Sequence, residues 1–79
     1  KAMSIQSKYK KFRWFAKWLE YANKLPDEEE RTFNRSVIMY GLRKEEPVKL
    51  TGNTLDYFNT HIRPEIDRQH KRLDRGLWI

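Results

Sequence analysis

The sequence of 79 residues contains no cysteine, so neither disulfides nor cysteine-bound zinc can stabilise the fold. It has no apolar run near the roughly 20 residues that cross a bilayer, and its first residues lack the apolar stretch of a signal peptide. We therefore expect a soluble, cytoplasmic protein with no membrane partner. Small folds without disulfides or metals are often completed by oligomerisation, so a homo-oligomer such as a homodimer is also expected.

The residues that usually carry catalysis are missing as well. There is no cysteine nucleophile, no glycine-rich phosphate loop and no His-Glu-x-x-His motif. His61 and His70 are placed about 180° apart around a straight helix, where they cannot share a metal ion. The sequence therefore predicts no enzyme, no cofactor, no metal site and no small-molecule substrate.

Aromatic and charged residues dominate what remains. Aromatic residues make up 14% of the chain, which is too much apolar mass for a disordered tail even though 35% of residues are charged. The apolar residues recur at helical spacing, and no extended alternating pattern predicts a sheet. A single all-α domain spanning residues 1–79 is expected.

The first two predicted helices are separated by a proline. Residues 7–25 contain no interior glycine or proline, and their apolar residues surround more than half of the helix circumference. Pro26 ends this helix because it lacks an N–H and disfavours helix at the preceding residue. Asp27 and Glu30 then form a predicted capping box for a second helix at about residues 28–43.

The second helix is apolar nearly all round over residues 37–42, which predicts a central, buried position; Gly41 either allows close packing or begins the helix exit. Thr51 or Asn53 is the predicted N-cap of the third helix. Its apolar residues form a single stripe: Leu55, Phe58, Ile62, Ile66 and Leu73. Because Pro64 interrupts this stripe, the expected fold is a small bundle of three principal helices, the third kinked at Pro64.

A set of short motifs supports a resemblance. They are Leu25-Pro26-Asp27-Glu28-Glu29, Tyr40-Gly41, Glu45-Glu46-Pro47, Leu50-x-Gly52, Phe58, Ile62-x-Pro64-x-Ile66-Asp67 and Arg72. In this arrangement the chain resembles a family of short helical proteins of phages, prophages and other mobile elements whose function is unknown. The resemblance implies a helical domain in a DNA-linked setting, and it transfers no catalytic residue.

The positive charge is concentrated near the start of the chain. Residues 1–24 contain seven Lys or Arg against one glutamate, a net charge of +6 that equals the net charge of the whole sequence. Four of these residues lie along one predicted helix stripe: Lys10, Arg13, Lys17 and Lys24. Such a stripe can follow the phosphates of DNA or RNA, or it can be an ordinary solvated helix face. Lys71, Arg72 and Arg75 form a second basic patch.

An aromatic face accompanies the basic stripe. Trp14, Trp18 and Tyr21 follow one another at spacings of four and three residues, which places them on one side of the first helix. Aromatic residues of this kind often dominate protein interfaces, so they are candidates for a partner interface. Alternatively, the first helix lies between the other two and both of its apolar faces are covered within one chain.

Two functions are compatible with these observations. The first is a non-enzymatic accessory protein of a phage or mobile element, which binds nucleic acid or a nucleoprotein complex through its basic aromatic first helix. The second is a protein–protein interaction or dimerisation module whose basic stripe is only a solvated surface.

Overall fold

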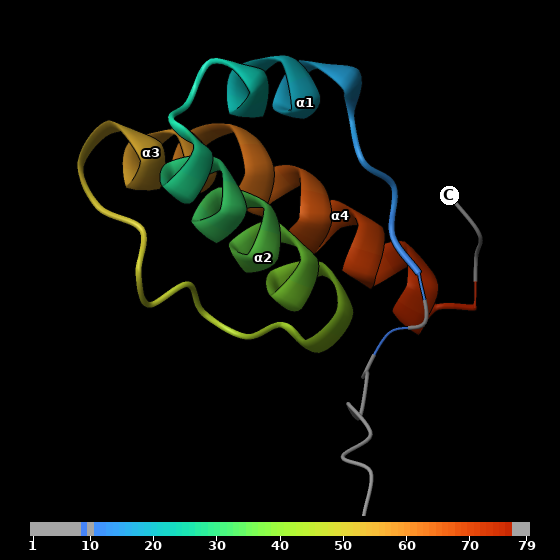
Figure 1. Ribbon diagram of the computed structural model, residues 1–79. Helices are drawn as coiled ribbons and strands as arrows, with labels where there is room; N and C mark the ends of the chain where they lie inside the picture. Colours follow the sequence, from blue (N-terminus) through green and yellow to red (C-terminus); the bar gives the residue numbers. More distant parts are fainter. Residues whose placement is uncertain (1–8, 10, 77–79) are drawn as a thin grey trace, which may run out of the picture.

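The computed structural model describes Tyr9 and residues 11–76. Its elements are α1 (Ala16–Asn23), α2 (Asp27–Arg43), α3 (Gly52–Tyr57), the π-helical turn η1 (Phe58–Ile62) and α4 (Arg63–Asp74). None of the described residues lies in a strand, which confirms the all-α prediction. The helices α2 and α4 lie side by side, and α1 crosses one end of the pair (Figure 1).

The first helix is shorter than predicted. It begins at Ala16, and residues 11–15, called the arm below, form no helix; Phe15, the last arm residue, has φ −85° and ψ 145°. The expectation of one helix over residues 7–25 is therefore wrong for Tyr9, for residues 11–15 and for residues 24 and 25, while residues 7, 8 and 10 lie outside the described residues. The physical reason is tertiary: the arm makes its contacts with α2 and α4 instead of continuing the helix.

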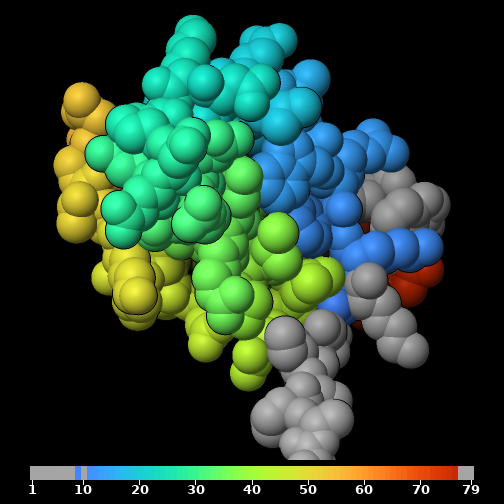
Figure 2. Space-filling view, viewed as in Figure 1, coloured from blue at the N-terminus to red at the C-terminus, as the bar shows by residue number. Residues whose placement is uncertain are grey.

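The arm is fixed against the body of the protein by close packing. A Cβ atom added at Gly41 would lie 2.5 Å from the ring of Phe12, so the missing side chain of Gly41 is what allows Phe12 to approach α2. Just before the arm, the backbone N–H of Tyr9 donates to the carbonyl of Leu42 at 2.8 Å, and its ring stacks on His70 with centroids 3.9 Å apart. Figure 2 shows the arm, in blue, packed directly against its neighbours.

The second helix has the predicted extent, but its start differs in detail. Pro26 is the N-cap, Asp27 is already helical, and no side-chain hydrogen bond caps the helix. The predicted capping box is therefore not formed; the N–H of Glu30 donates instead to the carbonyl of Pro26 at 2.8 Å. The acids of the first turn still face the positive end of the helix dipole. The helix ends at Arg43, and Lys44 follows in the left-handed conformation with φ 57°.

The core joins all the helical segments. Its fully buried large side chains include Trp18, Phe33, Val37, Tyr40, Phe58, Ile62 and Ile66. The middle of the predicted stripe on the third helix, Phe58, Ile62 and Ile66, is thus confirmed as core, while Leu55 and Leu73 are half-buried. Among the described helices, none combines the length and the apolar character needed to cross a membrane.

The third predicted helix is observed as α3, η1 and α4 in direct succession. The π-helical turn Phe58–Ile62 lies just before Pro64, which occupies the first turn of α4. Proline has no N–H to donate to the carbonyl four residues earlier, and a single π-turn is one way in which a helix absorbs such a defect. A bend of the axis at this point stays a prediction.

Candidate nucleic-acid interface

One face of α4 is rich in basic side chains. Arg68, Lys71, Arg72 and, at the C-cap, Arg75 are separated by three, one and three residues and are all exposed. At about 100° per residue these four side chains fall within an arc of about 100°. They form a continuous cationic strip along the helix, called the α4 basic face below.

The acids of α4 are placed elsewhere. Asp67 accepts a hydrogen bond of 2.5 Å from the hydroxyl of Tyr40, and Asp74 accepts one of 3.3 Å from the hydroxyl of Tyr9. Burial, followed by the hydrogen bond to Asp67, raises the pKa of Tyr40 to about 12. Glu65 forms a 2.8 Å salt bridge with Arg68. Two of the three carboxylates are therefore turned towards tyrosines of other segments, and only Glu65 pairs with the basic face.

Arg13 is held beside this face by Gln69. The side chain of Gln69 is only 5% exposed. Its Oε1 accepts a hydrogen bond of 2.6 Å from the backbone N–H of Arg13, and its Nε2 donates one of 3.1 Å to the carbonyl of Arg13. An amide can satisfy a backbone donor and a backbone acceptor at once. This contact therefore holds the backbone of the arm against α4 at Arg13.

A small groove lies where the arm packs against α4. It has a volume of about 260 Å³ and is lined by Arg13, Phe15, Glu65, Arg68, Gln69 and Arg72. In extended backbone, residues i and i+2 point to the same side, which explains why Arg13 and Phe15 both line it. Three guanidinium-bearing residues from two distant segments thus meet at one groove, which we call the arginine groove.

The basic stripe predicted on the first helix is not formed as expected. Lys10 lies outside the described residues, and Arg13 belongs to the arm. Lys17 is exposed on α1, and Lys24 is exposed at its C-cap. Since the helix starts at Ala16, Arg13 does not share a helical face with Lys17 and Lys24. The sequence did indicate Lys71, Arg72 and Arg75, but it missed Arg68, which the spacing of four residues to Arg72 could have revealed.

The predicted aromatic face is mostly covered within the chain. Trp18 has an exposed fraction of 0% and belongs to the core, so its assignment to a partner interface is wrong. Trp14 and Tyr21 are half-buried and pack against the same core. Tyr21 stacks on Tyr57 with ring centroids 3.9 Å apart.

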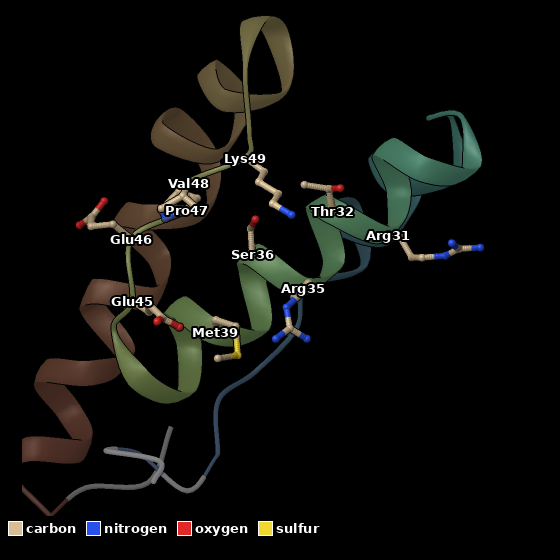
Figure 3. A pocket seen from close by; sticks show the side chains of 10 residues that line it. All are labelled: Arg31, Thr32, Arg35, Ser36, Met39, Glu45, Glu46, Pro47, Val48 and Lys49. Carbon is tan, nitrogen blue, oxygen red and sulfur yellow. The ribbon is translucent and has the colours of Figure 1, made fainter. Parts of the chain in front are cut away.

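A second groove lies between α2 and residues 45–49 (Figure 3). Its volume is about 560 Å³, and its charged residues are Arg31, Arg35, Glu45, Glu46 and Lys49. Arg63 binds the carboxylate of Glu46 at 2.9 and 2.7 Å and lowers its pKa. In Figure 3 the amine of Lys49 points towards the hydroxyl-bearing side chains of α2. Because two glutamates line it beside its cations, this groove suits a polyanion less well than the α4 basic face does.

The two histidines lie in different surroundings. His61 is exposed, whereas His70 is buried and its Nε2 lies 2.8 Å from the carbonyl oxygen of Gly41. Within Tyr9 and residues 11–76, no group of three or more His, Asp or Glu side chains is arranged to hold a metal ion. Comparison of the chain with protein-family models, with curated proteins and with solved structures found no match.

Proposed function

We propose that this chain is a non-enzymatic accessory protein that binds nucleic acid through the α4 basic face, with Arg13 beside it. The observation that carries the proposal is the run of four exposed cations at Arg68, Lys71, Arg72 and Arg75. The resemblance of its sequence motifs to those of short helical proteins of phages and mobile elements supports a DNA-linked role, alone or in a nucleoprotein complex.

The charges on α4 include repulsive pairs, while the cations at its C-terminal end also interact favourably with the helix dipole. Arg68 and Arg72 are four residues apart, as are Lys71 and Arg75. Like charges at this spacing destabilise a helix by about 0.2–0.5 kcal/mol per pair. An ordinary solvated face mixes both signs, whereas on this face only Arg68 has an acidic partner on α4, Glu65. A polyanion would remove the repulsion, which is the physical reason to prefer nucleic acid over a purely solvated surface.

The size of the basic face sets the expected strength of binding. The basic face carries four cations, and Arg68 and Arg75 are about 10 Å apart along the helix axis. About four phosphates can therefore be neutralised. The logarithm of the binding constant should fall with the logarithm of the salt concentration with a slope of about −3 to −4.

Fluorescence anisotropy with labelled DNA at several salt concentrations tests this function. A rise in salt from about 50 to 200 mM should weaken binding roughly 100-fold. A slope near zero, or no binding at the lowest salt concentration, would contradict the proposal. Circular dichroism at each salt concentration serves as the control that the fold is unchanged.

Self-association is the second candidate function. Some large apolar side chains stay exposed in the single chain: Leu19 at 51%, Ile38 at 40% and Val48 at 86%. A homodimer could cover part of this surface, and it would double the number of basic faces in one particle. Sedimentation equilibrium over a range of protein concentrations measures this directly; a monomer mass throughout would contradict it.

A further inference from the structure

We infer that the arginine groove receives an unpaired base of a single-stranded nucleic acid, with Phe15 as the stacking surface. This inference rests on the proposed function and specifies its substrate. The α4 basic face accounts for attraction to any phosphate backbone. The groove places an aromatic side chain, Phe15, beside that face. Binding of a phosphate backbone does not require an aromatic side chain.

The arm contacts both the core and the groove. Phe12, Trp14 and Phe15 all pack against the core, and the rings of Phe12 and Trp14 have centroids 6.1 Å apart. Phe15 also lines the groove, together with Arg13. A helical arm would have turned Phe12 and Phe15 to neighbouring positions on one face. The extended conformation is therefore what brings an arginine and an aromatic ring together at α4.

Phe15 is prepared for stacking on one side only. Its ring stacks on Trp18 with centroids 5.0 Å apart and planes at 19°. Trp18 is itself fully buried, so Phe15 rests on a rigid support. The stack with Trp18 covers one face of the ring, and Phe15 also lines the groove, so the part of the ring exposed there can meet a base. Phe15 is half-buried, as this arrangement requires.

The volume of the groove fits a single ring system. At about 260 Å³ it lies just below the range of about 300–1,000 Å³ that is typical for drug-sized ligands. A base would occupy it while the sugar and phosphate stay outside. Arg68 and Arg72, both exposed, are then placed for the flanking phosphates. Guanidinium groups suit this position because they pair with phosphates and also stack on flat rings.

The groove offers little to distinguish one base from another. Gln69 is its amide-bearing residue, and both ends of this amide are hydrogen-bonded to the backbone of Arg13. Glu65 is engaged by Arg68. Stacking is tolerant of sequence because every base has an aromatic face. Binding should therefore prefer single strands over duplexes, whose bases are paired and stacked, without strong sequence preference.

The test compares three fluorescein-labelled probes of matched phosphate number: an oligothymidylate of about 12 nucleotides, an abasic strand of equal length and a duplex hairpin. We expect the wild-type protein to bind the oligothymidylate at least about fivefold more tightly than the abasic strand or the hairpin. Phe15→Leu should remove this preference, whereas Phe15→Tyr, which keeps an aromatic ring, should retain it. Tyr57→Leu is the matched control, because Tyr57 is a half-buried aromatic residue that does not line the groove.

The outcomes separate the two proposals. Equal affinity for all three probes, with the expected salt dependence, overturns the base site and leaves the proposed function standing. No binding of any probe at low salt overturns both. If Phe15→Leu does not fold, as judged by circular dichroism, the comparison of the oligothymidylate with the abasic strand on the wild-type protein decides the question without a mutation.

Discussion

The side-chain amide of Gln69 forms two hydrogen bonds to the backbone of Arg13, which lies 56 residues earlier in the sequence. The bonds of 2.6 and 3.1 Å imitate the way in which a neighbouring strand would pair with the arm. Because Gln69 is also buried, the contact holds the arm on α4 at a defined register. It therefore connects the fold to the proposed site, since Arg13 and Phe15 reach the arginine groove from this arm.

Replacement of Gln69 should weaken the arm first. In Gln69→Leu two backbone groups of Arg13 lose their partner, which should lower the free energy of unfolding by about 1–3 kcal/mol. Urea denaturation measures this loss, and hydrogen exchange should show faster exchange of the Arg13 amide. The control is Lys71→Leu, an exposed neighbour on α4, which should change stability by no more than about 0.5 kcal/mol. Equal stability of the two variants would contradict this role of Gln69.

The contact between Phe12 and Gly41 gives a second prediction. In Gly41→Ala the new Cβ would lie 2.5 Å from the ring of Phe12, and overpacking of this kind costs about 1–3 kcal/mol. The better helix propensity of alanine offsets up to about 1 kcal/mol of that cost. A net destabilisation, measured by thermal or urea unfolding, is expected.

A double-mutant cycle isolates the clash. With Phe12→Ala in the background, Gly41→Ala should become neutral or stabilising, because only the helix propensity of α2 then changes. If Gly41→Ala destabilises the protein equally in both backgrounds, the ring of Phe12 does not occupy the space above Gly41.

Much of the interior could be predicted from the sequence, and the reasons are local. Pro26 and the acids after it determine where α2 begins, and the spacing of Phe58, Ile62 and Ile66 identifies the buried side of the third helical stretch. The start of the first helix could not be predicted in this way. Residues 11–15 have an acceptable helical pattern, and only the distant partners Gly41 and Gln69 favour the extended arm.

The site shows the same division. The spacing of the cations on α4 is visible in the sequence. The higher net charge of residues 1–24 nevertheless favoured a binding site on the first helix, including Lys17 and Lys24. The arginine groove depends on the docking of Arg13 by Gln69, which no pattern along the chain contains. Trp18 could not be assigned from its spacing alone, because an aromatic residue on a helix face is equally suited to a core and to an interface.

The pH dependence of stability should show the contribution of Tyr40. Its pKa is raised from 10.0 to about 12, first by burial and then by the hydrogen bond to Asp67. Because the folded protein holds this proton more tightly than the unfolded chain, the contribution is fully present below pH 10 and is lost as the pH rises to about 12. Urea unfolding at several pH values should therefore show falling stability in this window.

Tyr40→Phe provides the comparison. The variant is expected to be less stable near neutral pH because Asp67 loses its hydrogen-bond donor, and its stability should fall less steeply between pH 10 and about 12. The pKa values of Tyr9 and Tyr57 are raised as well, so tyrosinate absorbance of the folded wild-type protein should show several late-titrating groups, of which Tyr40→Phe lacks the one near 12. An unchanged stability profile would contradict the assignment to Tyr40.

The most direct test of the central claim compares two double charge reversals. Lys71→Glu with Arg72→Glu changes the α4 basic face, whereas Lys17→Glu with Lys24→Glu makes the same change of net charge on and after α1. DNA binding is measured for both variants and the wild type by anisotropy at several salt concentrations. The first variant should bind far more weakly, with its salt slope reduced by about 2, and the second should stay close to the wild type. Loss of binding in the second variant alone would contradict the α4 interface and return the site to the first helix.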